Sequence, residues 1–217
     1  IATYRDGLWS IDLNSDGGID RQIAYGDGEQ IPLMGDVNGD GFADLIIYNR
    51  RTGVWVIDST RDGVPDAGEF PFFLFGGQAG DAPLLGDLDG DGRDEPIIYR
   101  NGTWMTDPNR DGKADQTFTI SNVPVGRPVL VNWGTDCRTR AGVVVDGHWY
   151  IDSDDDRFAD VSFRYGYGSE IPLTGFFNTA NSIFVQEGAQ GTGGVYDPLG
   201  SISEAVAGHR PGQIIRV

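Results

Sequence analysis

The residues most suited to chemistry in this chain are carboxylates that recur with one fixed spacing. From Asp87 to Glu95, acidic side chains stand at positions 1, 3, 5 and 9 of a nine-residue stretch, and a glycine stands at position 6. Ca²⁺ prefers oxygen ligands of this kind at the odd positions of a tight loop, where the glycine permits the sharp turn and position 7 offers its backbone carbonyl. The stretch therefore predicts a calcium loop, related to that of an EF-hand but without the distant bidentate glutamate.

Six stretches of the chain share this spacing. Two follow a short apolar segment and are called first loops; four follow a segment that contains a tryptophan and are called second loops. The expected ligands of the first loops, at positions 1, 3, 5, 7 and 9, are Asp36, Asn38, Asp40, Phe42 and Asp44, and Asp87, Asp89, Asp91, Arg93 and Glu95. Those of the second loops are Asp12, Asn14, Asp16, Gly18 and Asp20; Asp58, Thr60, Asp62, Val64 and Asp66; Asp107, Asn109, Asp111, Lys113 and Asp115; and Asp152, Asp154, Asp156, Phe158 and Asp160.

Aspartate and glycine also favour turns that bind no metal, so plain hairpin turns are the alternative interpretation of these loops. The charge counts against this alternative, because the expected ligand positions of the six loops hold 20 of the 33 carboxylates of the chain. Without a metal, three or four like charges lie close together in each loop and oppose folding. Six Ca²⁺ ions would change the formal net charge from −17 to −5. We therefore expect about six calcium sites that stabilise the fold.

The segments around the loops repeat as well. Four similar apolar segments begin at Ile31, Ala82, Arg127 and Ile171, at intervals of 51, 45 and 44 residues. Each is followed by a first loop or its remnant, and then by an apolar strand and a glycine-containing turn. In the earlier repeats a tryptophan-containing strand and a second loop come next. The 33 glycines, 11 prolines and many aromatic residues favour short strands joined by tight turns. Repeats of roughly 40 to 50 residues with four strands each are typical of a β-propeller.

The predicted fold is therefore an all-β, five-bladed propeller of four-stranded antiparallel blades, in a single domain. Residues 1–12 match residues 96–107, so the chain begins at the second strand of a repeat, and residues 212–217 match a first strand. We expect this C-terminal strand to join the N-terminal blade and close the ring, since closure removes an open sheet edge. An open fragment of a longer array is the alternative. The expected blades are 1–31 with 212–217, 32–82, 83–127, 128–171 and 172–211.

Some loops of the repeat depart from the calcium pattern. In the first loop of the fourth repeat, Arg140 stands at position 9, where we expect its guanidinium to take the place of a cation. Residues 176–182 and 196–204 lack the ligand set and are expected to bind no metal. In the loop that begins at Asp152, Arg157 replaces the glycine, which makes it the weakest of the six predicted sites.

Three segments resemble a known family of repeats. They are GDVNGDGFAD from Gly35 to Asp44, GDLDGDGRDE from Gly86 to Glu95, and FGGQAGDAP from Phe75 to Pro83, and they resemble the FG-GAP and VCBS-type repeats of integrin-α-like propellers. At the level of the repeat the resemblance covers the whole chain, most closely residues 1–121. It implies a propeller with Ca²⁺ in the hairpins between the first and second strands of the blades. The second loops go beyond the usual pattern of that family.

Few residues suit catalysis. The chain has two histidines, His148 and His209, one cysteine, Cys137, and no Gly-x-Ser-x-Gly motif. Nearly every close pair of acids belongs to a predicted metal loop, so little remains for acid–base work. We expect no enzyme. A once-per-repeat tryptophan would suit a carbohydrate platform, but packing between blades is favoured because these residues share one strand register: Trp9, Trp55, Trp104 and Trp149.

Net charge and composition limit the classes of molecule that the chain is expected to bind. A net charge of −17 and a pI of about 4.2 argue against direct binding to nucleic acid or to anionic membranes. We expect an extracellular or cell-surface bacterial module, secreted and non-catalytic, that serves adhesion or assembly. Its ligand would be a protein or a polysaccharide, bound at variable turns such as residues 186–194. The alternatives are a calcium-dependent lectin and a self-associating subunit of a filament or surface array.

Overall fold

The computed structural model describes residues 1–14, 16–66, 72–132, 138–168, 170–172, 174, 182–184 and 214–216. Residues 1–174 and residues 175–217 form two compact units. All regular elements among the described residues are β-strands, and none of these residues belongs to a helix that could cross a membrane. The predicted fold class is therefore correct in being all-β.

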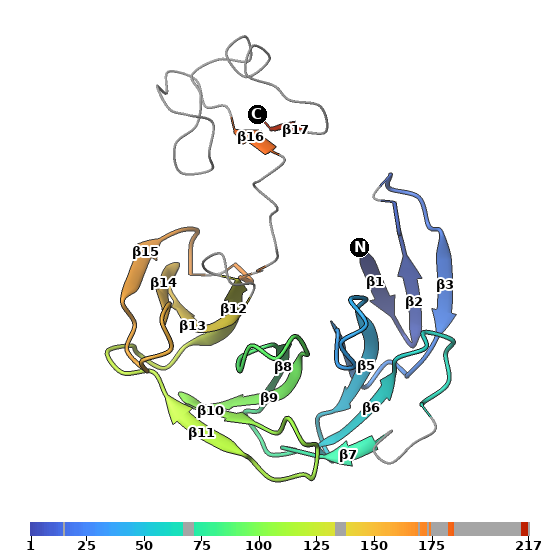
Figure 1. The fold of residues 1–217 in the computed structure, drawn as a ribbon, viewed down its shortest axis with the longest axis horizontal. Coiled ribbons are helices and arrows are strands. Elements are labelled where there is room, and N and C mark those ends of the chain that lie inside the picture. Colours follow the sequence, from blue (N-terminus) through green and yellow to red (C-terminus); the bar gives the residue numbers. More distant parts are fainter. Residues whose placement is uncertain are drawn as a thin grey trace. The chain divides into compact units, whose positions relative to one another are not determined.

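The first unit contains four antiparallel sheets, which we call blades 1 to 4 (Figure 1). In each blade, every strand pairs with the next strand of the sequence, as in the blades of a β-propeller. Blade 1 has three strands: β1 (Ala2–Arg5), β2 (Leu8–Ile11) and β3 (Arg21–Ala24). Blade 2 has four: β4 (Ile31–Gly35), β5 (Asp44–Asn49), β6 (Val54–Asp58) and β7 (Phe72–Leu74).

Blades 3 and 4 are also four-stranded, which confirms the predicted propeller of antiparallel blades. Blade 3 consists of β8 (Ala82–Gly86), β9 (Glu95–Arg100), β10 (Thr103–Thr106) and β11 (Gln116–Thr119). Blade 4 consists of β12 (Arg127–Asn132), β13 (Thr139–Val145), β14 (His148–Ile151) and β15 (Val161–Arg164). The first strands of blades 2, 3 and 4 begin at three of the residues where the sequence repeat begins.

Two finer expectations are not met. The described residues form four blades rather than five, and the expected fifth blade, residues 172–211, lies almost entirely outside them. The described residues do not show the predicted pairing of the C-terminal strand with the N-terminal blade. Strand β17 (Ile214–Arg216) pairs in parallel with β16 (Ser182–Phe184) in the second unit, and blade 1 is three-stranded. Pairing with β16 closes a much shorter loop of chain than pairing with β1, so it costs less conformational entropy.

The second strand of each four-stranded blade lies in the core. Strands β5 and β9 are buried over five consecutive residues, and β13 is buried along most of its length. A strand covered on both faces needs apolar residues on both, which explains the unbroken apolar runs of these sequences. The third strands alternate instead between buried and partly exposed residues, as expected for the next position towards solvent.

The recurrent tryptophans are core residues, which confirms the packing interpretation. Their exposed fractions range from 0% to 8%. Trp55 lies parallel to Phe73 of the neighbouring strand with ring centroids 5.8 Å apart, and its indole N–H donates to the carbonyl of Phe75 at 2.9 Å. Its cluster also contains Ile98 of blade 3, so the tryptophan layer joins one blade to the next. Since these rings are buried, they cannot form a carbohydrate platform.

An aromatic-glycine pair follows the last strand of blade 2. The φ angle of Gly76 is +87°, a region that residues with a Cβ avoid. A Cβ here would lie 2.8 Å from a carboxylate oxygen of Asp81 and 2.9 Å from Ile98 and from the hydroxyl of Tyr48. Glycine is therefore required both for the backbone angle and for the close approach of blade 3.

We predict that Gly76→Ala destabilises the protein more than Gly80→Ala does. Both glycines have a positive φ angle, but the nearest atom to a Cβ at Gly80 is 3.9 Å away. Both variants carry the cost of the left-handed conformation, about 1–2 kcal/mol, and only Gly76→Ala adds a clash, worth roughly 1–3 kcal/mol. Urea unfolding of the two variants measures the difference. Equal losses would contradict the steric explanation.

Candidate metal centres

The structure places all six predicted loops in hairpins. The first loops join β4 to β5 and β8 to β9, and the second loops join β2 to β3, β6 to β7, β10 to β11 and β14 to β15. In a four-stranded meander, the first and third connections lie at the same end of the sheet. The two loops of a blade are therefore neighbours, and in blade 2 the register pairs Leu45 with Asp58, beside the end of the first loop at Asp44.

One hydrogen-bond pattern recurs in all six loops. The backbone N–H at position 6 donates to the carboxylate at position 1, at 2.7–3.1 Å. The N–H at position 7 donates to Oδ1 of the aspartate at position 5, at 2.7–2.9 Å. The aspartate at position 5 uses its Oδ1 for this contact, whereas the aspartate at position 1 accepts backbone N–H groups through both oxygens in four loops, those that begin at Asp36, Asp58, Asp87 and Asp107.

A third hydrogen bond ties the start of the loop to its end. In five loops the N–H at position 2 donates to the acid at position 9, at 2.7–3.0 Å. The loop 107–115 differs because position 2 is Pro108, which has no N–H. There the side-chain amide of Asn109 donates to Asp115 at 2.9 Å. The predicted loops are thus one structural motif, built by contacts within nine residues.

The loop 87–95 gathers all four of its acids. Oxygen atoms of Asp87, Asp89, Asp91 and Glu95 lie within 4.8 Å of one another. Glu95 is 5% exposed; its Oε2 accepts the N–H of Leu88, while its Oε1 is buried and has no hydrogen-bond partner. Burial, chiefly, together with the nearby charges of Asp89 and Asp87, raises the pKa of Glu95 to about 8. A cation would satisfy this oxygen and offset the repulsion, so the residues present fit a metal ion.

The loop 152–160 gathers three acids, Asp152, Asp154 and Asp156. Asp152 is fully buried, and its Oδ1 has no hydrogen-bond partner. Burial is also the main cause that raises the pKa of Asp152. The predicted ligand Asp160 lies outside this group, because Ser153 donates to both of its oxygens, through its N–H at 2.9 Å and its hydroxyl at 2.7 Å.

Arg157, which replaces the glycine at position 6, does not disrupt this loop. It adopts a φ angle of +70°, as a glycine would, and its N–H donates to Asp152 at 3.0 Å. Its guanidinium lies 3.7 Å from the ring centroid of Phe118 in blade 3. This contact between cation and aromatic ring offsets part of the cost of the backbone angle. The loop that the sequence made the weakest candidate is therefore one of the two, among the described residues, in which three or more acids gather.

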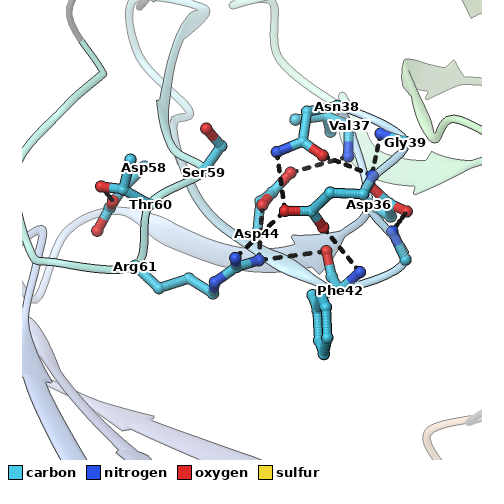
Figure 2. Close-up of polar contacts among 12 residues, drawn as sticks. Asp36, Val37, Asn38, Gly39, Phe42, Asp44, Asp58, Ser59, Thr60 and Arg61 are labelled. Atoms are coloured by element: carbon cyan, nitrogen blue, oxygen red, sulfur yellow. Dashed lines mark hydrogen bonds and ion pairs between the residues drawn. The ribbon is translucent and has the colours of Figure 1, made fainter.

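The loop 36–44 contacts a cationic side chain, that of Arg61. The guanidinium of Arg61, from the second loop of the same blade, points into its ligand set (Figure 2). Arg61 Nη2 lies 3.3 Å from Asp40 Oδ2, and Nη1 lies 3.2 Å from Asp44 Oδ1 and 3.5 Å from the carbonyl oxygen of Phe42. These are the oxygens of positions 5, 7 and 9. Burial still raises the pKa of Asp44 to about 6.

The other three second loops satisfy part of their own ligand oxygens. Their position 3 is an amide or a hydroxyl, and in all three it donates to an acid of its own loop, as Asn109 does to Asp115. Asn14 donates to Asp16 at 3.2 Å and Thr60 donates to Asp58 at 3.2 Å. In the loop 107–115 the ammonium of Lys113 lies 3.4 Å from Asp111. These loops keep the predicted shape but contain fewer acids for a metal.

Arg140, the residue at position 9 of the degenerate first loop in blade 4, is buried. Its exposed fraction is 6%, its Nε donates to the carbonyl of Ser153 at 2.9 Å, and it lies 3.6 Å from Asp155. It therefore contacts the second loop of its own blade. The contact of Arg61 with the first loop of blade 2, which has the same two positions with the charges exchanged, was not predicted from the sequence. The signal was present, since Arg61 and Asp155 occupy the same position 4 of their loops with opposite charge.

Several other candidates lie outside the described residues. They include Cys137, His209, residues 186–194, residues 133–137 of the fourth first loop, and almost all of residues 176–182 and 196–204. His148 is described, and its ring stacks on Tyr150 with centroids 4.8 Å apart.

A comparison with models of known protein families finds no match to this chain. A comparison with curated proteins finds no match either.

We predict that Glu95→Gln stabilises the metal-free protein. The amide of glutamine can donate to Asp89 where Glu95 Oε1 has no partner, and an unsatisfied buried group of this kind costs about 1–3 kcal/mol. Thermal unfolding in excess chelator measures the change. Glu29→Gln is the matched control, because the Glu29 side chain is 75% exposed and should tolerate the change without effect. A lower melting temperature for Glu95→Gln would contradict the prediction.

Proposed function

We propose that this chain is a calcium-stabilised β-propeller module whose acidic loops bind Ca²⁺. The observation that carries the proposal is the cluster at 87–95, where four acids converge and one buried carboxylate oxygen of Glu95 has no partner. A buried carboxyl oxygen without a partner is costly, so a bound cation is the simplest way to satisfy this site. The cluster at 152–160, with its unpartnered Asp152 oxygen, supports the same conclusion.

The choice of Ca²⁺ rests on the type and number of the ligands. All six loops offer carboxylate, amide, hydroxyl or carbonyl oxygens and contain no histidine or cysteine, which argues against Zn²⁺. Five donor positions in a short loop, some able to bind through two oxygens, suit the six to eight ligands of Ca²⁺ better than the octahedral shell of Mg²⁺. When bound, the ion would offset most of the repulsion among the carboxylates of the loop and hold its two strands together.

The repeat pattern extends the proposal to the rest of the chain. The segment IPLTGF from Ile171 to Phe176 matches the starts of blades 2, 3 and 4, and we assign residues 172–211 to a fifth repeat. The motifs at Gly35–Asp44, Phe75–Pro83 and Gly86–Glu95 support kinship with FG-GAP and VCBS-type propellers. This kinship is part of the proposal.

The biological role follows from the chemistry of the loops. Calcium loops of modest affinity fill where the ion is near millimolar, so the module fits an extracellular or cell-surface setting. The acids of the loops serve stability, and few groups remain for catalysis. The role is therefore a non-catalytic one in adhesion or assembly, with a protein or polysaccharide ligand.

A lectin is the second candidate, and one observation favours it. Tyr165 and Tyr167, at the end of blade 4, are 73% and 75% exposed, and Tyr167 borders a cavity of about 230 Å³ that Arg127, Asp146 and Glu170 also line. Exposed aromatic faces beside polar groups suit a sugar ring. Binding on a glycan array, lost in Tyr167→Ala and retained in Phe72→Ala, would favour the lectin, since Phe72 is 66% exposed on another blade.

We predict that removal of calcium lowers the melting temperature. With a Kd of roughly 0.1 mM and about 1 mM Ca²⁺, each filled site adds roughly 1.4 kcal/mol. Two filled sites add about 3 kcal/mol, which corresponds to a shift of roughly 6–12 °C for a chain of this size. Thermal unfolding with and without EDTA measures this shift, and EDTA saturated with Ca²⁺ is the control. A melting temperature that EDTA leaves unchanged would overturn the proposed function.

A further inference from the structure

Arg61 occupies an unusual backbone position for an arginine. It stands at position 4 of the second loop 58–66 with a φ angle of +58°, a conformation that costs a residue with a Cβ about 1–2 kcal/mol. From there its side chain crosses to the first loop 36–44 of the same blade (Figure 2). The side chain is only 27% exposed, so it packs between the two loops rather than extending into water.

The contacts of Arg61 coincide with the ligand positions for a metal. Its guanidinium lies 3.2–3.5 Å from oxygens of Asp40, Phe42 and Asp44, three of the five expected ligands of that loop. Asp44 is fully buried and needs a positive partner. A guanidinium supplies that charge and several N–H donors. Ca²⁺ needs the same oxygens at roughly 2.3–2.6 Å, so the ion and the guanidinium cannot occupy the loop together.

Blade 4 shows the same contact with the charges exchanged. There the residue at position 4 of the second loop is Asp155, and the residue at position 9 of the first loop is Arg140, with Arg140 Nε 3.6 Å from Asp155 Oδ2. In blade 2 these two positions are Arg61 and Asp44. Position 9 of the first loop and position 4 of the second loop thus hold an acid and an arginine in either order, which indicates that the charge at one position depends on the charge at the other. The repeat therefore gives a second, independent instance of an arginine that serves the loop pair as its cation.

Blade 3 provides the contrast. It has the same residue types as blade 2 at these positions, Glu95 and Arg110, yet Arg110 turns away and its Nη2 donates to the carbonyl of Val37 in blade 2 at 2.6 Å. Among the described residues, no ion pair joins Arg110 to Glu95, and both line a cavity of about 330 Å³. Glu95 Oε1 is the oxygen left without a partner. In blade 3, where Arg110 turns away, the acids of the first loop gather. In blade 2, where Arg61 reaches the first loop, two of its acids contact the arginine.

We propose that Arg61 is a tethered cation that competes with Ca²⁺ for the loop 36–44. This inference rests on the proposed function and adds a regulation to it. Calcium enters the loop 36–44 only when Arg61 leaves, so this site fills at a higher calcium concentration than the loop 87–95. Departure of Arg61 also alters the second loop of blade 2 and the contact in which Arg21 of blade 1 donates to the carbonyl of Arg61 at 2.6 Å. Binding at one loop is thereby coupled to its neighbours.

The decisive variant is Arg61→Gln, compared with the wild type and with Arg51→Gln. Arg51 is the matched control because its side chain is 82% exposed and lies 3.8 Å from the exposed Glu29. In EDTA, Arg61→Gln should lower the melting temperature, since buried Asp44 loses its cation. In calorimetric titration with Ca²⁺, the same variant should bind at the loop 36–44 at least about tenfold more tightly, because a competing charge has been removed. A variant that destabilises without calcium and tightens calcium binding is the expected signature.

Further variants assign the change to its loop. Asp40→Asn in the Arg61→Gln background should abolish the added affinity, whereas Glu95→Gln should weaken only the site at 87–95. Arg61→Lys retains the positive charge without the bidentate reach and should give an intermediate affinity, which keeps the test available if Arg61→Gln does not fold.

The two proposals fail in different ways. If the wild type binds calcium at 87–95, but Arg61→Gln and Arg61→Lys titrate as the wild type does, the competition is refuted and the proposed function stands. If the wild type and Arg61→Gln both bind no calcium, the proposed function fails and the competition fails with it. Tighter calcium binding in Arg51→Gln equal to that in Arg61→Gln would also refute the competition, because the effect would then be one of net charge.

Discussion

The structure depends on the way each blade neutralises carboxylates that it buries at one end. Asp44, Glu95 and Asp152 are each at most 5% exposed, and burial is the main cause that raises the pKa of all three. Such groups require hydrogen bonds and a counter-charge. Blade 2 meets the need with Arg61. Blades 3 and 4 leave an oxygen without a partner, and those blades gather acids that suit a metal.

Hydrogen bonds join the first loops to the next blade at the end of the sheets where the acidic loops lie. The N–H of Asp94 in blade 3 donates to the carbonyl of Asp36 in blade 2 at 2.7 Å, and a carboxylate oxygen of Asp94 accepts the N–H of Asp36 at 2.7 Å. The N–H of Thr139 in blade 4 donates to the carbonyl of Asp87 at 2.9 Å. Position 1 of each first loop is therefore held by the next blade, and an ion that orders one loop also orders a contact between blades.

The hydrophobic clusters and the acidic loops stabilise the fold in different ways. Each hydrophobic cluster combines residues of one blade with residues of the next, as Trp104 and Val143 do between blades 3 and 4. These contacts need no bound metal, since they arise from burial of apolar area. The loops add a contribution that depends on a cation. A cation bound at the loops, as proposed above, would act on the ends of the blades while the tryptophan layer remains packed.

The sequence alone determined the loops and the starts of the blades. Their hydrogen bonds join residues within nine positions, as from Gly92 to Asp87, and the apolar runs follow the strand register, so local residues suffice. Tertiary structure decided which loops gather acids and which hold an arginine, because Arg61 reaches Asp44 from 17 residues away. It also decided that β17 pairs with β16. Contacts between segments distant in the chain depend on geometry that no single stretch encodes.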